Sequence, residues 1–434
     1  MVEQLEMKVR GSASLSGEVR VPGDKSISHR AALLGAVAHG ETKIEGFLAG
    51  EDCLSTLRCL AQLGIQVQRE GEDCVRVFGK GWSGLTEPVD VLDVGNSGTT
   101  IRLLMGLLAA APFHVVLAGD ASIAKRPMKR VLEPLGRMGL RYDGRKEGNY
   151  APIAMRGGPL APIVYRSEVA SAQLKSAVLL AALQADGETR YSEPFLSRDH
   201  TERMLEAFGA RLRREGSEVV LSGRQELQAT EIRVPGDLSS AAFFIAAALI
   251  LPGSRLWLKD VGINPTRTGM LDVLQQMGAR LELRNVRTWG AEPVADLYVE
   301  HCRLNATRIA GALIPRLIDE LPILALLATQ ADGETVIANA EELRVKETDR
   351  IAAVCQVMQA FGADVLPTSD GMVIHGPTPL HAANVSSLGD HRIGMTAFVA
   401  AMAAAGESQI TQAEAIDVSF PAFAKKMENL LQSS

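Results

Sequence analysis

The chain repeats one pattern of hydrophobic and polar positions along most of its 434 residues. A small-residue apolar run comes first, then Gly-Glu-Thr or a variant of it, and then an alternating run typical of a β-strand. Four clear and two weaker copies occur, at Gly40, Gly187, Gly333, Gly406, Gly253 and Pro112. Successive copies lie 66 to 80 residues apart, and 434 divided by six is about 72, so six units fill the chain.

A second feature follows most copies, an amphipathic stretch that ends in glycine just before another strand-like run. The glycines are Gly64, Gly139, Gly209, Gly278 and Gly362. Glycine just past a helix is typical of a left-handed C-terminal cap. The period is too long for ordinary solenoid repeats, so each unit is predicted to be a small α/β subdomain with helix, strand, helix and strands in order.

A longer duplication lies over the six units. VRVPGDKS at Val19 to Ser26 matches IRVPGDLS at Ile232 to Ser239, 213 residues further on. Val-Pro-Gly interrupts regular structure, so both segments are predicted to be hinges. We therefore expect two domains of three units each, 22–235 and 1–21 plus 236–434, with the N-terminal strand returning to the second domain.

The apolar helices begin at similar places in the six units. Their starting segments are GDKSISHR, GNSGTTIR, ASAQLKSA, GDLSSAAF, LIDELPIL and GDHRIGMT. Asp, Asn, Ser and Gly are typical of helix N-termini, where free amide donors and the helix dipole attract anions. Several starts also contain Lys or Arg, which predicts a site for a small substrate with several phosphates or carboxylates.

Composition limits the other possibilities. The net charge is −6, the pI is about 5.9 and aromatic residues make up only 4%, which argues against a general nucleic-acid or membrane-surface binder. The five cysteines include no CxxC pair, and the histidines show no ligand spacing such as HExxH, so neither a metal nor an organic cofactor is indicated. No stretch resembles a signal peptide or a membrane span, and we expect a cytoplasmic protein.

These motifs carry a resemblance that extends nearly from end to end. GDKSISHRA, GNSGTTIRLL, RPM, SAQLKSA, RDHTE, NPTRTG, RVKETDR and GDHRIGM occur in the order found in the 5-enolpyruvylshikimate-3-phosphate (EPSP) synthases. This family is also called the 3-phosphoshikimate 1-carboxyvinyltransferases. The resemblance implies an α/β enolpyruvyl transferase fold, an inside-out α/β barrel of two domains, each with three βαβαββ units, and a cleft between the domains.

The resemblance also implies the reaction. The family transfers the enolpyruvyl group of phosphoenolpyruvate to the 5-hydroxyl of shikimate 3-phosphate and releases phosphate through a tetrahedral intermediate. The two substrates bring two phosphates and two carboxylates, whose burial requires many Arg and Lys side chains. Proton transfers in the addition and the elimination also require an acid/base pair. We expect no cofactor, no metal, no nucleic acid and no membrane partner, and a monomer.

The family's functional residues map onto positions of this chain. By resemblance, shikimate 3-phosphate would contact Lys25, Ser26, Arg30, Ser171, Ala172, Gln173, Arg198, Asp319 and Lys346. Phosphoenolpyruvate would contact Lys25, Asn96, Gly98, Arg126, Gln173, Arg350 and Arg392. Asp319 would accept the proton of the attacking hydroxyl, Glu347 would protonate the methylene carbon, and Lys25 would share the proton transfers.

Spacing supports some of these assignments and leaves alternatives for others. Ser26 and Arg30 are four residues apart, so one helix face presents both. Glu347 and Arg350 are three apart, which predicts that they share a helix face and that Arg350 orients Glu347. Arg198 has an equally good alternative, an ion pair with Glu202 at the start of a helix.

Two departures from other family members point to a subgroup. Val418 stands where some members have a lysine that contacts phosphoenolpyruvate, and Ser122 stands where some have an additional arginine. Both features, with SAQ-x-K, RDHTE and NPTR, resemble the bacterial subgroup whose members often tolerate glyphosate. Gly98 is retained, whereas certain strongly tolerant members have alanine there, so tolerance is a hypothesis.

Three alternatives compete with this interpretation. The sister enzyme that uses UDP-N-acetylglucosamine has a cysteine in the loop where this chain has Ala121. A relative that binds anions without catalysis would have lost an acid/base residue first, and both Asp319 and Glu347 are present. A nucleic-acid module would need a localised basic stripe in an acidic chain.

Overall fold

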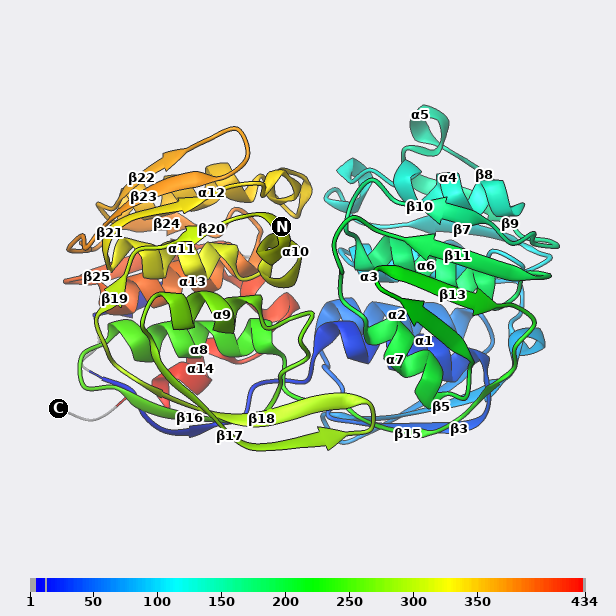
Figure 1. Ribbon diagram of the computed structural model, residues 1–434, viewed down its shortest axis with the longest axis horizontal. Coiled ribbons are helices and arrows are strands. Elements are labelled where there is room, and N and C mark those ends of the chain that lie inside the picture. Colours follow the sequence, from blue (N-terminus) through cyan, green and yellow to red (C-terminus); the bar gives the residue numbers. More distant parts are fainter. Residues whose placement is uncertain (1–4, 12–13, 432–434) are drawn as a thin grey trace. The chain divides into compact units, whose positions relative to one another are not determined.

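The computed structural model describes residues 5–11 and 14–431. Contacts divide the chain into two compact units, which can be followed by colour in Figure 1. The N-terminal unit comprises Gly23–Val234 and Trp289–Ala291, and the C-terminal unit comprises Met1–Pro22, Pro235–Thr288 and Glu292–Ser434. The two Val-Pro-Gly segments lie at the ends of these ranges.

One short segment falls in a different unit from the one that the sequence predicts. Residues 236–434 were expected to form part of one domain, yet Trp289–Ala291 group with the N-terminal unit. The Arg233 guanidinium carbon lies 3.5 Å from the centre of the Trp289 ring, and Arg203 donates to the Ala291 carbonyl at 2.8 Å. This segment is the turn of a long hairpin, so its grouping depends on contacts that are remote in sequence.

The N-terminal unit contains three sheets, each with a parallel strand pair followed by antiparallel pairs. Side chains alternate between buried and less buried along strands such as VRVFGK, as the pleat requires. The first sheet contains β14 (Leu227–Gln228), β15 (Glu231–Arg233), β3 (Ala38–Glu45), β5 (Cys74–Lys80) and β4 (Gln66–Glu70). The second contains β6 (Leu92–Asp93), β7 (His114–Ala118), β9 (Tyr150–Arg156) and β8 (Arg141–Gly144), and the third β10 (Val164–Arg166), β11 (Glu188–Ser192), β13 (Glu218–Ser222) and β12 (Leu212–Glu215).

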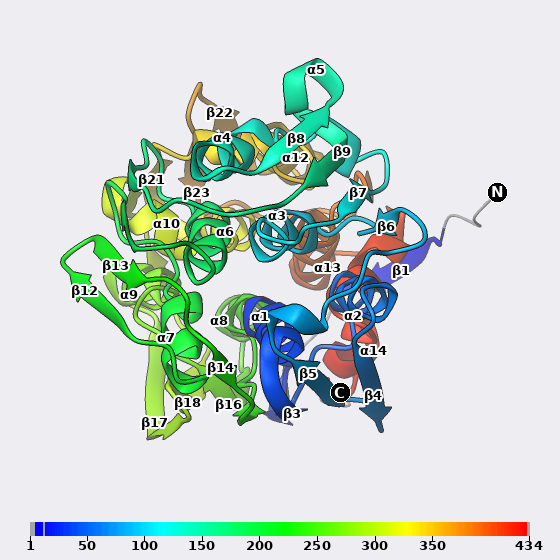
Figure 2. The same ribbon diagram turned by 90° about the vertical axis from the view of Figure 1, so that its right-hand side faces the viewer.

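Three helices fill the inside of this unit: α1 (Lys25–Val37), α3 (Gly98–Leu107) and α6 (Ala172–Ala182). Eleven of the 13 residues of α1 are buried, so this helix is covered on all sides and needs no polar stripe. Figure 2 shows the three helices nearly end-on, with the sheets around them. A Cβ atom on Gly106 would lie 2.2 Å from the Ala177 carbonyl oxygen, so glycine allows α3 and α6 to approach closely.

Three further helices of the unit are partly exposed: α2 (Glu51–Gln62), α4 (Lys129–Met138) and α7 (His200–Ala207). The short α5 (Arg145–Gly148) follows β8. The glycines predicted to end amphipathic helices have φ values between 77° and 120° in both units, which confirms the predicted left-handed caps.

The C-terminal unit repeats this plan with its own three sheets. The N-terminal strands β1 (Met7–Arg10) and β2 (Ser16–Val19) join two of them, β1 antiparallel to β25 and β2 parallel to β16. The sheets contain β17 (Arg280–Trp289), β18 (Glu292–Glu300), β16 (Arg255–Gly262) and β2; β19 (Leu304–Asn305), β20 (Arg308–Ile309), β21 (Ala331–Ile337), β23 (Met372–Gly376) and β22 (Asp364–Pro367); and β1, β25 (Glu407–Thr411) and β24 (Asn384–Ser386).

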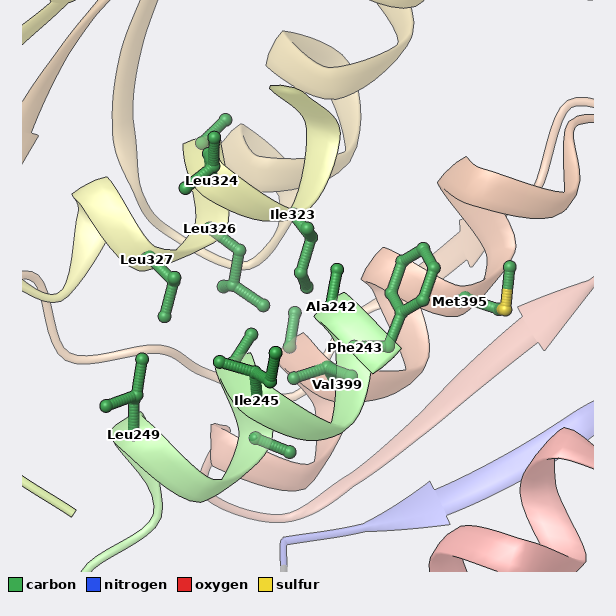
Figure 3. Packing of buried hydrophobic residues seen from close by; sticks show 14 of the residues in the cluster. Ala242, Phe243, Ile245, Leu249, Ile323, Leu324, Leu326, Leu327, Met395 and Val399 are labelled. Carbon is green, nitrogen blue, oxygen red and sulfur yellow. The ribbon is translucent and has the colours of Figure 1, made fainter. Parts of the chain in front are cut away.

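The central helices of the C-terminal unit are α8 (Leu238–Ile250), α11 (Leu321–Thr329) and α13 (His391–Ala403). Their apolar side chains interdigitate in Figure 3, where Ile245, Leu326 and Val399 come from the three different helices. All three side chains are fully buried, and each such burial stabilises the fold by about 1.5–3 kcal/mol. The remaining helices are α9 (Gly269–Gln276), α10 (Ile314–Leu317), α12 (Arg350–Ala360) and α14 (Phe423–Glu428).

The six central helices begin within the predicted segments, and five of them have a side-chain cap, whereas α11, which follows Glu320, has none. The side chains of Asp24, Ser97, Ser171, Asp237 and Asp390 each accept a hydrogen bond from a backbone N–H in the first turn of the helix that follows. Such caps satisfy donors that have no partner within the helix. They place the functional motifs at equivalent helix ends of each unit.

Candidate active site

The start of α1 holds the first predicted residues of the N-terminal unit. Lys25 is the first residue of the helix, and its ammonium lies 3.0 Å from Asp52 Oδ2. Its side chain is 18% exposed, so it remains accessible to a ligand. Ser26 and Arg30 follow on the same helix face, as predicted, and Arg30 Nη1 donates to the Ser26 carbonyl at 2.9 Å.

Arg30 is buried and held by hydroxyl groups from other helices. Its Nε donates to Thr201 Oγ1 and its Nη2 to Ser176 Oγ, both at 2.7 Å. Ser176 belongs to α6 and Thr201 to α7, so one guanidinium joins three helices. Bonds to neutral oxygens hold a guanidinium in position without cancelling its charge.

The start of α3 brings Asn96, Gly98 and Arg126 together. Arg126 Nη2 donates to Asn96 Oδ1 at 3.0 Å and to Ser122 Oγ at 3.1 Å. A Cβ atom on Gly98 would lie 2.8 Å from Arg126 Nη1 and 3.2 Å from Arg102 Nη1. Glycine at this position therefore leaves the two guanidinium groups where they are.

The start of α6 lies beside α3. Ser171 caps the helix, Ala172 is its first residue, and Gln173 reaches across to α3. Gln173 Nε2 donates to Thr99 Oγ1 at 2.9 Å, and its Oε1 accepts from Arg102 Nη1 at 2.5 Å. The side-chain amide of Gln173 is thus fixed in orientation.

Arg198 joins the first of these groups. Its Nη1 lies 3.4 Å from Ser26 Oγ, although the two residues are 172 positions apart. Glu202, the alternative ion-pair partner considered for Arg198, pairs with Lys175 at 2.8 Å. Lys175 itself points into the interior of the unit and also pairs with Glu193.

The predicted residues of the C-terminal unit form one cluster around Asp319. This residue lies in the turn between α10 and α11, and its side chain is 13% exposed. Its carboxylate lies 3.3 Å from Arg350 Nη1, 3.6 Å from Arg392 Nη2 and 3.8 Å from Lys346 Nζ. Arg392 also donates to the Asp319 carbonyl at 3.1 Å.

Glu347 belongs to this cluster, although the predicted reason was wrong. A shared helix face was expected for Glu347 and Arg350, but the short 3-10 helix Glu341–Val345 ends before Glu347 and α12 begins only at Arg350. The turn before the helix brings them together instead, and Glu347 Oε2 accepts from Arg350 Nη2 at 2.6 Å. Asp349 caps α12, so the turn that contains Glu347 ends at Asp349 and the helix begins at Arg350.

Asp390 is a member of the cluster that the sequence did not single out. It is fully buried, and its carboxylate binds Arg350 Nε at 2.8 Å and the Arg392 backbone N–H at 2.8 Å. The sequence indicated that Asp390 caps a helix, and the structure shows that it does. A capping motif does not reveal that the same carboxylate also binds Arg350, 40 residues away. Asp52 and Arg102 were likewise missed as partners of Lys25 and Gln173, because both contacts are remote in sequence.

Opposite charges lie next to one another in the C-terminal cluster. Three cations, Lys346, Arg350 and Arg392, lie among three carboxylates, those of Asp319, Glu347 and Asp390. Burial lowers the pKa of Lys346, with Asp319 acting in the opposite direction, although 28% of the Lys346 side chain remains exposed. Burial also disfavours the charged form of Arg350, but the three carboxylates outweigh it and raise its pKa. Arg350 is therefore a permanent cation.

The described residues contain neither a group of metal-ligand side chains nor a membrane-spanning helix. Within residues 5–11 and 14–431, no three His, Cys, Asp or Glu side chains are grouped so that they would bind a metal ion. Over the same part of the chain, every helix is too short or too polar to cross a membrane.

Comparison with known proteins decides the family. A family model described as EPSP synthase (3-phosphoshikimate 1-carboxyvinyltransferase) matches residues 9–427. The chain belongs to the EPSP synthase family. The 3-phosphoshikimate 1-carboxyvinyltransferase of Brevibacillus brevis is 58% identical over 417 residues, which cover 96% of this chain and 98% of the relative. That of Bacillus licheniformis is 55% identical over 429 residues, 99% of this chain and 100% of the relative.

Solved structures agree. An EPSP synthase from Acinetobacter baumannii matches with a TM-score of 0.88 and 41% identity, over 99% of this chain and 98% of that one. The enolpyruvyl transferase NikO from Streptomyces tendae matches with a TM-score of 0.80 at 20% identity, over 99% and 97%, which shows the shared fold alone. The predicted α/β enolpyruvyl transferase fold is confirmed.

The activity follows from the family. The protein is a 3-phosphoshikimate 1-carboxyvinyltransferase of the shikimate pathway, which leads to chorismate and the aromatic amino acids. Its substrates are phosphoenolpyruvate and shikimate 3-phosphate. The sister activity on UDP-N-acetylglucosamine and a non-catalytic role are thereby set aside.

Proposed function

We propose that Asp319 and Glu347 are the acid/base pair of this EPSP synthase and that Lys25 assists them. The observation that supports this most is that Arg350 holds both carboxylates, at 3.3 and 2.6 Å, although they are 28 residues apart in the chain. Their side chains are 13% and 18% exposed, whereas Arg350 behind them is 1% exposed. An accessible pair of carboxylates on a buried cation suits proton transfer to and from bound substrate.

The proposed steps balance in protons and bonds. The 5-hydroxyl oxygen of shikimate 3-phosphate bonds to C2 of phosphoenolpyruvate, and its proton passes to Asp319 while Glu347 protonates C3. In the resulting tetrahedral intermediate, the Glu347 carboxylate takes a proton back from C3, the carbon–oxygen bond to phosphate breaks, and the enol double bond forms again. Phosphate leaves with the electrons of that bond.

The N-terminal unit is proposed to supply most of the shikimate 3-phosphate contacts. The residues proposed for this substrate are Lys25, Ser26, Arg30, Ser171, Ala172, Gln173 and Arg198, together with Asp319 and Lys346 of the C-terminal unit. The proximity of Arg198 to Ser26, and of Arg30 to the same residue, supports a site for one phosphorylated ring at the start of α1.

The residues proposed for phosphoenolpyruvate are Lys25, Asn96, Gly98, Arg126, Gln173, Arg350 and Arg392. The hydrogen bond from Arg126 to Asn96 and the close approach of Gly98 support a phosphate or carboxylate subsite at the start of α3. Arg392 has a 9% exposed side chain, and Arg350 is proposed to act here mainly by charge because it is buried.

These assignments predict that two arginine substitutions separate the substrates. Arg198→Ala is expected to raise the KM for shikimate 3-phosphate by about tenfold or more, because a charge-assisted hydrogen bond is lost, and to leave the KM for phosphoenolpyruvate within about threefold. Arg126→Ala is expected to do the reverse. Initial rates of phosphate release, with each substrate varied in turn, measure both. Arg213→Ala, on an exposed strand of the same unit, is the control, and equal effects on both substrates would contradict the assignment.

We further propose that the protein belongs to the glyphosate-tolerant bacterial subgroup. Ser122 supports this, since its hydroxyl accepts a hydrogen bond from Arg126 at the position where some members have an additional arginine. Val418, which ends the 3-10 helix Ala413–Val418, also supports it. An inhibition constant for glyphosate in the low micromolar range would refute the proposal.

Gly98→Ala is predicted to weaken phosphoenolpyruvate binding. The added methyl group would lie 2.8 Å from Arg126 Nη1, so the guanidinium must shift, which flexible side chains can do at little cost to folding. The KM for phosphoenolpyruvate is expected to rise by about tenfold, with the KM for shikimate 3-phosphate unchanged and the melting temperature within about 2 °C. Gly158→Ala is the control, because its Cβ would meet nothing within 4 Å. An unchanged KM for phosphoenolpyruvate would contradict this prediction.

We also propose that the enzyme acts as a cytoplasmic monomer. The acidic net charge of −6 supports this proposal, because a net charge away from zero favours a soluble, monomeric state. Sedimentation equilibrium at assay concentrations measures the state of assembly.

A further inference from the structure

Two motifs of the chain meet in the interior of the N-terminal unit, away from the accessible ends of its helices. Lys175 of SAQLKSA lies 2.8 Å from Glu202 of RDHTE and 2.9 Å from Glu193, which follows β11. Each of the three side chains is 1% exposed. The two carboxylates outweigh desolvation and raise the pKa of the ammonium, so Lys175 is charged. None of the three is a proposed substrate contact.

Stability alone does not explain this cluster. Burying charges costs free energy that an ion pair often does no more than offset, and an apolar core of the same volume is frequently as stable. Here two carboxylates share one ammonium, which is one more buried carboxylate than pairing requires. The second carboxylate therefore calls for a reason other than neutralising Lys175.

The contacts of Glu193 supply that reason. Its Oε1 accepts hydrogen bonds from the Ser197 backbone N–H at 2.8 Å and from Ser197 Oγ at 2.9 Å, while Lys175 donates to the Ser197 carbonyl at 3.3 Å. All three polar groups of Ser197 are thus tied to the buried pair. By contrast, Phe195 and Leu196 in the same loop are 47% and 46% exposed.

Ser197 directly precedes Arg198. Because its N–H, hydroxyl and carbonyl are all held, the backbone position from which the Arg198 side chain extends is determined by Glu193 and Lys175. Glu202 holds the other side of Lys175 but has no contact with Ser197 among the described hydrogen bonds. Glu193 therefore binds the residue that precedes Arg198, and Glu202 does not.

We infer that Glu193, with Lys175, is a positioning residue for Arg198 and so for the binding of shikimate 3-phosphate. This inference rests on the proposed role of Arg198. It gives the lysine of SAQLKSA a function other than substrate contact. Lys175 connects α6, the helix that also contains Gln173, to the loop in which Arg198 lies.

Glu193→Met and Glu202→Met form a matched pair of variants. Each removes one carboxylate of similar size and leaves Lys175 with the other, so the change in buried charge is the same. Calorimetric titration with shikimate 3-phosphate is expected to show about tenfold weaker binding for Glu193→Met and less than about a twofold change for Glu202→Met. The KM for phosphoenolpyruvate, and kcat at saturating shikimate 3-phosphate, should stay within about threefold in both.

Two milder variants keep the test valid if Glu193→Met folds poorly. Glu193→Gln retains an acceptor oxygen and is expected to restore binding to within about threefold of the parent protein. Ser197→Ala removes one of the three contacts and should weaken binding by about threefold. Melting curves of all variants show whether binding follows stability, and equal losses of binding for Glu193→Met and Glu202→Met would overturn the inference.

A double-mutant cycle tests whether Glu193 acts through Arg198. In an Arg198→Ala background, Glu193→Met is expected to weaken binding by less than about twofold further, because the side chain that it positions is gone. The same tenfold loss in that background would overturn the inference and leave the role of Arg198 intact. If Arg198→Ala alone leaves affinity unchanged, the proposed contact of Arg198 fails, and the inference fails with it. Weak binding by Arg198→Ala with normal binding by Glu193→Met refutes the inference alone.

Discussion

Asp319→Asn and Glu347→Gln are each expected to lower kcat by about 10²- to 10⁴-fold, the usual contribution of a general acid or base. Both amides keep the size and the hydrogen-bond acceptor of the parent side chain, so Arg350 retains a partner at 3.3 and 2.6 Å. Affinity for shikimate 3-phosphate should therefore stay within about threefold. Phosphate release under saturating substrates measures kcat, and calorimetric titration measures affinity.

The two variants are distinguished by the proton that each residue is proposed to move. If Glu347 protonates C3, Glu347→Gln also loses incorporation of solvent deuterium into the methylene group of phosphoenolpyruvate. Asp349→Asn is the matched control, because Asp349 lies in the same RVKETDR segment but caps α12, and asparagine caps a helix equally well. A loss of kcat below about tenfold for either test variant would refute its proposed role.

Arg350→Met is expected to destabilise the C-terminal unit by about 3–5 kcal/mol, the typical result of removing one partner of a buried ion pair. The Arg350 side chain is 1% exposed and binds Asp319, Glu347 and Asp390, and the Asp390 side chain is 0% exposed. Without the guanidinium, the Asp390 carboxylate loses a charged partner that water cannot replace. The free energy of unfolding therefore falls, and urea unfolding measures by how much.

The unit in which the loss occurs makes this prediction specific. Hydrogen exchange should accelerate at the amides of α11 and α13, which flank the cluster, and not at those of α1, α3 and α6 in the other unit. Arg10→Met is the control, since the Arg10 side chain is 83% exposed and its pair with Glu407 should contribute less than about 1 kcal/mol. A destabilisation of Arg350→Met no greater than that of Arg10→Met would show that the cluster is solvated.

The starts of the helices that present the proposed site residues could be predicted, because the signals are local. A capping side chain and the first turn that it caps lie within three residues of each other, as Asp24 and Ser171 illustrate. The left-handed glycines after the amphipathic helices are equally local. The sixfold repeat then makes each segment comparable with five others, so the central helices and the motifs at their starts were identified correctly.

Most partners of those residues could not be predicted, because they come from distant parts of the chain; the pair of Glu347 with Arg350, three residues apart, was predicted. Lys175 lies at a helix start, as Lys25 does, which we propose to bind substrate, yet Lys175 points inward to Glu193 and Glu202. Glu347 meets Arg350 through a turn, where helical spacing predicted a helix face. The hairpin turn Trp289–Ala291 groups with the N-terminal unit, whereas its position in the sequence indicated the C-terminal unit.

By itself, the sequence determined the class of fold, the six repeats, the starts of the central helices and the motifs that identify the family. The helix starts and the elements within each repeat depend on periodicity and capping, whose physical range is a few residues, whereas the motifs identify the family by resemblance. The tertiary structure decided which groups become partners: Arg30 donates to hydroxyls 146 and 171 residues away, and Arg350 pairs with the carboxylate of Asp390, 40 residues away. Such contacts exist only once packing excludes water around them, because in an extended chain each of these groups would be solvated by water instead.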